Sequence, residues 1–171
     1  MPNRIIIIGA AALPFLLFCL NALYPRDSST ELYRKAARLA ASGELDSAIP
    51  IFKRVIEVSP CYCMGHYGLG KAYLYKQGML QEAIKHLRTS VNLDRKFVKG
   101  HFYLGVAYFL AKKYRLAASA FKAAYSFDAS YVEALYNLGA IYEIIGKRYE
   151  SQVYFTRYLT ERVKKEEDVI F

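Results

Sequence analysis

The side chains best suited to bind a metal lie in one short stretch, Cys61-x-Cys63-x-x-His66. Thiolate sulfur and imidazole nitrogen are ligands that zinc prefers, so three of them within six residues resemble part of a metal site. A closed zinc site needs four ligands, and no fourth candidate accompanies these three. We therefore predict neither a bound metal nor a cofactor.

Catalytic groups are equally sparse along the chain. An enzyme needs a nucleophile beside a base, a pair of carboxylates or a metal cluster, and we find no convincing set of this kind. The three histidines are the only obvious bases. His66 and His101 share one position of a repeat, where we expect packing against the partner helix, and His86 should face solvent. We predict that the chain is not an enzyme.

The elements that would position any site repeat with a period of about 34 residues. Small residues followed three positions later by a large one recur as Ala36-x-x-Leu39, Gly70-x-x-Tyr73, Gly105-x-x-Tyr108 and Gly139-x-x-Tyr142. A second series keeps the same spacing, and pairs a small residue with a large one four residues later: Ala48 with Phe52, Ala83 with Leu87, Ala117 with Phe121 and Ser151 with Phe155. Four repeats fill residues 29 to 165.

Helix packing explains this spacing. Two antiparallel helices approach to about 8 to 10 Å only where the facing residues are small, so we expect Gly70 to face Ala83. Apolar residues at intervals of three and four form the stripe that meets the partner helix. A single hairpin would leave an apolar face in water, so several hairpins must stack to bury it.

Two segments carry a recognisable pattern. Residues 134–142 (ALYNLGAIY, with Gly146 and Ser151 following) and residues 101–108 (HFYLGVAY, with Ala117 and Phe121 following) resemble the tetratricopeptide repeat signature. The resemblance implies an all-α, right-handed superhelical solenoid of four antiparallel helix hairpins, and it implies protein binding without naming a partner. The expected repeats are residues 29–62, 63–97, 98–131 and 132–165, followed by a tail at 166–171.

Two departures from the repeat pattern predict local differences. Repeat 2 has one extra residue in the turn around Gly78, so this turn should be longer. The proline that closes repeat 1, Pro60, is replaced in later repeats by Arg95, Ala129 and Val163. Since proline stops a helix, its loss would allow the later second helices to run on.

Residues 1–25 read as a hydrophobic anchor or signal segment. Ile5–Tyr24 is a run of 20 residues without a charge, long enough to cross about 30 Å of hydrocarbon as a transmembrane helix. We favour a retained, single-pass anchor over a secretory signal cleaved after Ala22 or a lipoprotein signal ending at Cys19, because cleaved apolar regions usually span about 7 to 15 residues. Basic residues on both sides leave the orientation open, and we favour the exported side.

The basic residues of the chain predict a possible binding surface. The chain has a net charge of +9, and basic residues gather at the turns inside repeats 2 to 4. This basic edge consists of Lys76, Lys112, Lys113, Arg115, Lys147 and Arg148. It could rest on anionic lipid or an acidic partner, or it could be solvated without a partner. Binding of nucleic acid is disfavoured, because single-strand binding interleaves aromatic and basic residues, which lie on different faces here.

The inner faces of the first helices carry an aromatic row, Tyr33, Tyr67, Phe102 and Tyr136. Tyrosine gives a large contact area with few rotors to freeze, which suits a binding groove. The carboxylate clamp of this family needs Lys, Asn and Arg on the inner helices, but Ala37 and Gly68 stand at two of those positions, so we expect no such clamp. The predicted partner-binding residues are Tyr33, Tyr67, Lys71, Lys99, Phe102, Tyr103, Tyr136 and Asn137.

We therefore predict a membrane-tethered scaffold or assembly factor that binds a protein or peptide through an aromatic-lined groove. There are two alternatives. The chain could be a secretion chaperone of the type III kind, or it could bind nucleic acid or an anionic surface through the basic edge. At the end of the stack, Tyr158 replaces the smaller residues Val55, Ser90 and Ala124. We expect an exposed apolar end face there, covered by Val169-Ile170-Phe171 or by a second copy in a homodimer.

Overall fold

The computed structural model describes residues 28–167, and within that range all regular elements are α-helices. In chain order they are α2 (Ser28–Ala41), α3 (Leu45–Val58), α4 (Cys63–Tyr75), α5 (Leu80–Leu93), α6 (Val98–Leu110), α7 (Tyr114–Phe127), α8 (Glu133–Ile144) and α9 (Arg148–Glu167).

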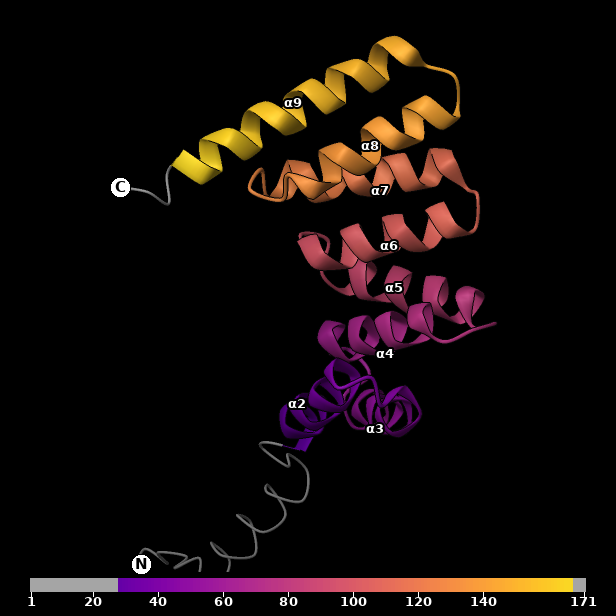
Figure 1. Cartoon of the computed structure of the whole chain (residues 1–171). Coiled ribbons are helices and arrows are strands. Elements are labelled where there is room, and N and C mark those ends of the chain that lie inside the picture. Colours follow the sequence, from indigo (N-terminus) through magenta and orange to yellow (C-terminus); the bar gives the residue numbers. More distant parts are fainter. Residues whose placement is uncertain (1–27, 168–171) are drawn as a thin grey trace, which may run out of the picture.

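The helices pair into four hairpins, α2–α3, α4–α5, α6–α7 and α8–α9, stacked one on the next (Figure 1). Each second helix also packs on the first helix of the following hairpin. Across the repeat boundaries α2 contacts α4 and α4 contacts α6, whereas within residues 28–167 no comparable contact joins α3 to α5 or α5 to α7. The first helices therefore lie closer together and line the concave side over repeats 1 to 3. The prediction of an all-helical stack of hairpins is confirmed for the described residues.

In repeats 2 to 4 the hairpin closes where a glycine of the first helix faces a large side chain of the second, and in repeat 1 Ala36 takes the place of this glycine. A methyl group on Gly70 would lie 2.8 Å from Leu87 Cγ and 3.2 Å from the carbonyl oxygen of Ala83, so the predicted contact of Gly70 with Ala83 is confirmed. The next two repeats use the same arrangement, with Gly105 against Phe121 and Gly139 against Phe155.

The turn within each hairpin passes through a left-handed residue. Gly43, Gly78 and Gly146 adopt φ values of 87°, 76° and 78°, but repeat 3 places Lys112 at this position with φ 57°. A side chain here is strained, since only glycine adopts this backbone freely. The turn of repeat 2 is one residue longer than the others, Lys76–Met79 between α4 and α5, as its extra residue predicted.

Aspartates, rather than prolines, end the second helices of repeats 2 and 3. The Oδ1 atom of Asp94 accepts a hydrogen bond from the backbone N–H of Lys96 at 3.0 Å, and Asp128 accepts one from the backbone N–H of Ser130 at 2.9 Å. These turns replace the helical hydrogen-bond pattern, so α5 and α7 stop before Arg95 and Ala129. The prediction that these two helices run on is wrong.

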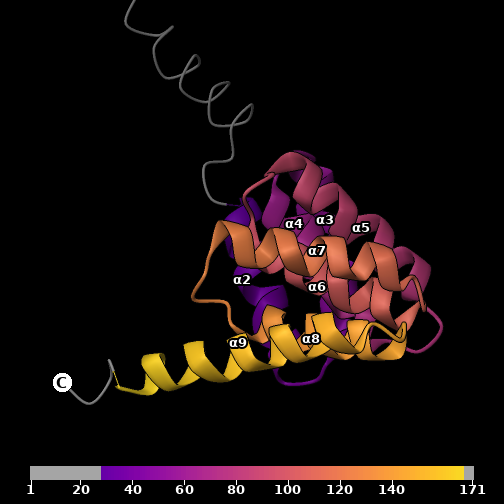
Figure 2. The ribbon, with the colours of Figure 1, turned by 90° about the horizontal axis from the view of Figure 1, so that it is seen from above.

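Only α9 runs on. Its residue at the equivalent of Asp94 is Arg162, whose side chain cannot accept a hydrogen bond from the backbone. The helix therefore continues to Glu167 over 20 residues, and its C-terminal part extends beyond the rest of the stack (Figure 2).

The two ends of the stack differ in polarity. Tyr158 is not the exposed end residue we predicted, because its ring packs on Tyr136 of its own hairpin with centroids 5.4 Å apart. The outer side of α9 instead exposes Tyr149, Val153, Leu159 and Val163. The opposite end, on α2, exposes the charged residues Glu31, Lys35 and Arg38. The predicted cover, Val169-Ile170-Phe171, lies outside the described residues.

Among the helices of residues 28–167, none combines the length and the apolar character needed to cross a bilayer. The predicted anchor, residues 1–25, lies outside the described range.

We predict that Lys112→Gly raises the free energy of unfolding by about 0.5 to 1 kcal/mol, because glycine adopts a positive φ without the strain that a Cβ causes. Chemical denaturation followed by circular dichroism measures the change. The reciprocal variant, Gly146→Lys, should destabilise by a similar amount. An unchanged or lower stability of Lys112→Gly would contradict the strain at this turn.

Candidate functional site

A groove opens between the first helices of repeats 1 and 2. It encloses a cavity of ≈ 260 Å³ whose walls come from α2 and α4, with contributions from α3 and the start of α6. Its lining includes four of the residues predicted from the sequence, Tyr33, Tyr67, Lys71 and Lys99. The cavity thus lies on the concave side of the stack, where the first helices approach each other most closely.

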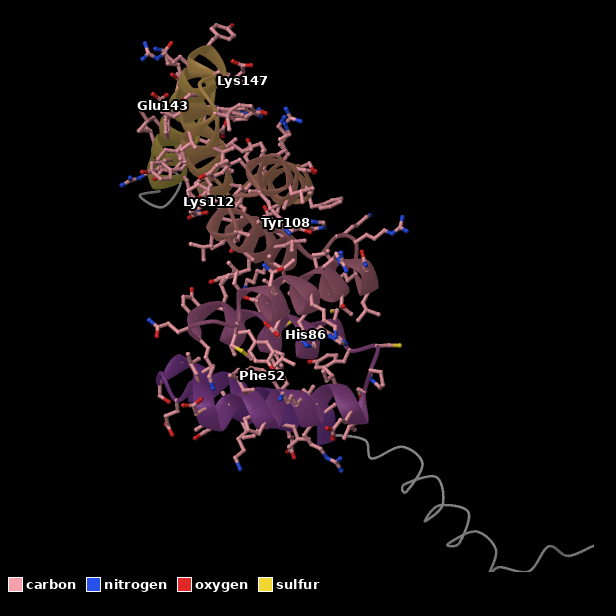
Figure 3. All side chains as sticks on the ribbon, turned by 90° about the vertical axis from the view of Figure 1, so that its right-hand side faces the viewer. Phe52, His86, Tyr108, Lys112, Glu143 and Lys147 are labelled. Carbon is pink, nitrogen blue, oxygen red and sulfur yellow. The ribbon has the colours of Figure 1, made fainter. Side chains whose placement is uncertain are left out.

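The floor of the groove is apolar and depends on a glycine. Phe52 of α3 lies under Gly68 of α4, so closely that a Cβ at Gly68 would overlap the ring. The ring of Tyr33 packs on Phe52 with centroids 5.7 Å apart. Phe52 is labelled in Figure 3 between the first and second hairpins. Because Gly68 has no side chain, the Phe52 ring can line the cavity together with Met64 and Ala72.

The rim of the groove is basic. The Nζ atom of Lys71 lies 4.6 Å from the ring centroid of Tyr103, a cation–π contact that holds the ammonium group without neutralising it. Lys99 lies exposed on the same rim. The residues that line the cavity include no carboxylate. The groove therefore offers two uncompensated positive charges beside an apolar floor.

The tyrosines of the groove act as protonated phenols. Burial, followed by the neighbouring Tyr62 and Cys63, raises the pKa of Tyr33 to about 12. Burial and the neighbouring Tyr103 likewise raise the pKa of Tyr67, and the same two causes raise the pKa of Tyr75. At neutral pH each hydroxyl can donate a hydrogen bond, so the phenols and ammonium groups together favour an acceptor-rich, anionic ligand.

Tyr103 joins these residues without lining the cavity itself. Its ring makes an edge contact with Tyr67 at 5.7 Å between centroids and carries the ammonium group of Lys71. It therefore orients a residue of the rim. Five of the predicted site residues thus form one cluster: Tyr33, Tyr67, Lys71, Lys99 and Tyr103.

The other three predicted residues lie further along the stack. Phe102 packs on Phe121 of its own hairpin and on Tyr131, with centroids 5.3 Å and 5.0 Å apart. Tyr136 is 52% exposed, and its ring leans on α9. The side-chain amide of Asn137 donates to the carbonyl oxygen of Glu133 at 2.8 Å. The aromatic row is in register along the chain, but its second half does not share the cavity.

Met64 and Tyr75 are the two large side chains of α4 that line the cavity and were not among the predicted site residues. Met64 stands one turn before Gly68, and Tyr75 one turn after Lys71. Together these four residues are spaced by four, three and four positions, which places them along one face of α4. That spacing is visible in the sequence, and it was the signal that would have identified them.

His66 and His101 are built into the fold, whereas Cys61 and Cys63 are not bonded to each other. His66 Nε2 lies 3.1 Å from the carbonyl oxygen of Pro60, and His101 Nε2 lies 2.9 Å from that of Arg95. Each histidine thus ties its helix to the preceding loop, six residues back. Cys61 is exposed and Cys63 is partly buried, both as free thiols. Within residues 28–167 no three His, Cys, Asp or Glu side chains gather as a metal site would require.

His86 does not face solvent as predicted. Its ring is half-buried and stacks on His66 with centroids 5.4 Å apart, and the two Nδ1 atoms are 3.2 Å apart. Burial, together with His66 and the nearby cations of Lys85 and Lys53, lowers the pKa of His86 from 6.5 to about 4, against a smaller opposing effect of Glu82. Protonation would place a cation in this stack, so the folded state favours the neutral ring.

We predict that the free energy of unfolding falls as the pH drops from 6.5 towards 4. In this range His86 is protonated in the unfolded chain but remains neutral in the folded chain. The stabilisation is fully present above pH 6.5. Discounted for solvent exposure, the loss should be about 1 to 2 kcal/mol. Urea denaturation at several pH values measures it.

His86→Gln should flatten the part of this slope between pH 6.5 and 4. His101→Gln is the control, since it removes a histidine that lies outside the stacked pair. If both variants kept the full slope of the parent chain, the acid sensitivity would come from other groups and the assignment to His86 would be wrong.

Comparison with known families agrees with this architecture. The family described as TPR repeat matches residues 74–112, which run from the end of α4 through α5 and α6. Comparison with curated protein sequences finds no significant match.

Solved structures of similar shape span most of the chain. MamA superimposes with a TM-score of 0.78 at 22% identity, covering 86% of this chain and 85% of MamA. A thermophilic TPR protein from Thermus thermophilus gives 0.66 at 20% identity, covering 88% and 86%. The first TPR of Spaghetti (RPAP3), bound to the HSP90 peptide SRMEEVD, gives 0.67 at 19%, covering 70% and 94%. At these identities the comparisons establish a tetratricopeptide-repeat fold.

Proposed function

We propose that this protein is a membrane-tethered scaffold whose groove binds an acidic segment of a partner protein. The observation that carries the proposal is the cavity between α2 and α4, where Lys71 and Lys99 stand over an apolar, tyrosine-lined floor without a carboxylate. A segment with acidic side chains at the rim and an apolar side chain between them would satisfy both surfaces.

The chemistry of the groove favours a peptide over a small metabolite. The cavity is open along the concave side and is lined by three helices of two neighbouring repeats and the start of the next. Tyrosine rings supply contact area at a low entropic cost, and their hydroxyls can satisfy peptide carbonyl groups. An extended chain would gain hydrogen bonds along its length, which a compact metabolite would not.

A structure of the same fold supports a negatively charged ligand. The first TPR of Spaghetti (RPAP3) is bound to a peptide whose sequence, SRMEEVD, ends in an acidic stretch. In this chain the clamp positions on α2 and α4 carry Ala37 and Gly68, and both line the cavity. The groove here would therefore recognise acidic side chains along a segment rather than a terminal carboxylate.

The tether rests on the sequence alone. The uncharged run Ile5–Tyr24 is followed by only three residues before α2 begins at Ser28. If the run crosses a bilayer, the solenoid must lie close to the membrane surface, because three residues span at most about 10 Å. A protein held in this way would collect its partner at the membrane.

Fluorescein-labelled peptides that alternate Glu with Leu or Phe test the groove. We expect them to bind the full chain, whereas the same peptides with Lys in place of Glu should not bind. Lys71→Gln with Lys99→Gln should weaken binding by about thirtyfold, at about 1 kcal/mol for each charge. Tyr75→Ala, at a residue that is 62% exposed and therefore safe for the fold, should weaken it by at least about fivefold. Fluorescence anisotropy measures each affinity.

Lys164→Gln with Lys165→Gln is the control, because it removes the same charge at the far end of α9 and should leave the affinity unchanged. The peptide SRMEEVD should bind more weakly than the longer acidic peptides, since it relies on a clamp. Equal binding of acidic and basic peptides, or no binding of either, would refute the groove as proposed.

A further inference from the structure

A second surface combines positive charge with exposed apolar side chains. It lies on the two turns α6–α7 and α8–α9, which stand one above the other on the same side of the stack (Figure 1). Figure 3 looks onto this side, with Lys112 and Lys147 labelled. We call it the membrane edge and define it by the cations Lys112, Lys113, Arg115, Lys147 and Arg148 and the apolar residues Leu110, Leu116, Ile144, Ile145 and Tyr149.

The apolar residues of the membrane edge are unusually exposed. Leu110, Leu116 and Ile144 are 53%, 49% and 50% exposed, and Tyr149 is 76% exposed. At the position of Leu116 the other three repeats carry Ser47, Glu82 and Glu150. Repeat 3 therefore places a leucine where its neighbours place a polar side chain. Large side chains beside cations at the tips of turns suit the boundary between lipid headgroups and acyl chains.

One cation is kept at a structural cost. Lys112 occupies the left-handed position that glycine fills in the other three turns. The backbone N–H of Lys112 donates to the carbonyl oxygen of Phe109 at 2.9 Å. Its side chain forms no hydrogen bond or ion pair within the described residues, so no polar contact of the side chain offsets the strain. Strained positions gather at functional sites, so a lysine here points to a role at the tip of the turn.

A hollow between α7 and α8 adds a place for a phosphate group. Its volume is ≈ 390 Å³, and its lining includes Arg115, Ser119, Lys122 and Lys147 around Tyr142. The ammonium groups of Lys122 and Lys147 lie 5.5 Å and 5.9 Å from the centroid of the Tyr142 ring. The neighbouring hydroxyl of Tyr142 raises the pKa of Lys122, which favours the charged form of this side chain.

Few carboxylates oppose these cations. Glu150 makes an ion pair with Lys147 at 3.2 Å, and Glu143 is exposed at the end of α8. In repeat 2, by contrast, Lys76 is paired with Asp46 of α3. The basic edge predicted from the sequence is therefore strongest in repeats 3 and 4. Within the described residues, Lys112, Lys113, Arg115 and Arg148 form no ion pair there.

We propose that the membrane edge rests on the surface of an anionic phospholipid membrane, with a lipid phosphate in the hollow beside Tyr142. Each cation near such a surface strengthens partitioning by about fivefold. Leu110, Leu116, Ile144 and Tyr149 would enter the headgroup region, and the lysine stems would extend along it. Charge complementarity favours this occupant over a neutral bilayer.

This docking is independent of the groove. The groove lies on the first helices of repeats 1 to 3, whereas the membrane edge lies on the turns of repeats 3 and 4. A solenoid resting on these turns would keep its groove open to a partner. The two surfaces would then act together, one setting the orientation on the membrane and the other holding the ligand.

The chain contains no tryptophan, so a single introduced tryptophan can report on the edge. Tyr149→Trp is made in the full chain and mixed with vesicles of phosphatidylcholine alone or with phosphatidylglycerol. We expect its emission to move to shorter wavelength only with phosphatidylglycerol, and the shift should weaken as salt screens the charges. Phe127→Trp, at the other end of α7, is the matched control and should not shift with either vesicle.

Arg115→Gln with Lys147→Gln, in the Tyr149→Trp background, should lower partitioning into anionic vesicles by about thirtyfold, since each cation contributes about fivefold. Lys35→Gln with Arg38→Gln removes the same charge from exposed positions on α2 and should have little effect. Circular dichroism confirms that each variant is folded.

Several outcomes would overturn the proposal. The proposal is wrong if the emission of folded Tyr149→Trp stays constant in anionic vesicles or shifts equally in neutral ones. It is also wrong if the shift persists after Arg115 and Lys147 are neutralised. Inorganic phosphate that abolishes the shift at low millimolar concentration would assign the hollow to a soluble phosphate, and displacement of the vesicles by single-stranded DNA would assign the edge to nucleic acid. Loss of peptide binding in the groove, with the shift retained, would leave this proposal standing.

Discussion

The whole structure depends on how closely the two helices of a hairpin can approach. Gly70, Gly105 and Gly139 each stand where a large side chain of the facing helix would collide with a Cβ. Because these positions have no side chain, the large side chain of the facing helix fills the space, and the apolar faces of both helices are buried. Any side chain at these positions, even the methyl group of alanine, would force the facing side chain or the helices to shift.

Close hairpins in turn dictate the curvature. A second helix must also cover the first helix of the next repeat, so every hairpin depends on its neighbours and no hairpin is complete alone. Since the first helices lie nearer to one another than the second helices do, the stack bends, and the cavity over Phe52 and Gly68 forms on the inside of the bend. The groove is thus a consequence of packing, and its floor consists of core residues.

Tyrosine rings hold several of the cations in this protein. Lys71 lies over Tyr103, Lys122 and Lys147 lie over Tyr142, and Arg157 lies over Tyr125. An ion pair restrains a cation but cancels its charge, whereas the face of an aromatic ring restrains it and leaves the charge intact. A chain of net charge +9 with 16 tyrosines can therefore position cations that still attract anions. The groove uses this arrangement at Lys71, and the hollow of the membrane edge uses it at Lys122, whereas Lys147 is also paired with Glu150.

The sequence by itself determined the periodic part of the structure. The spacing of glycine, alanine and large apolar residues predicted the hairpins, the contact of Gly70 with Ala83 and the longer turn at Gly78, because these are local properties of helix geometry. It did not determine which polar atoms meet. The aspartates that end α5 and α7, the stacking of His86 on His66 and the pairing of Lys76 with Asp46 join residues whose distances depend on how the repeats pack. For the same reason the tertiary structure alone decided which predicted residues share the cavity: Tyr33, Tyr67, Lys71 and Lys99 do, and Phe102, Tyr136 and Asn137 do not. The position of a residue in the repeat determines which face of the helix it lies on. The bend of the stack determines which residues of other repeats lie beside it.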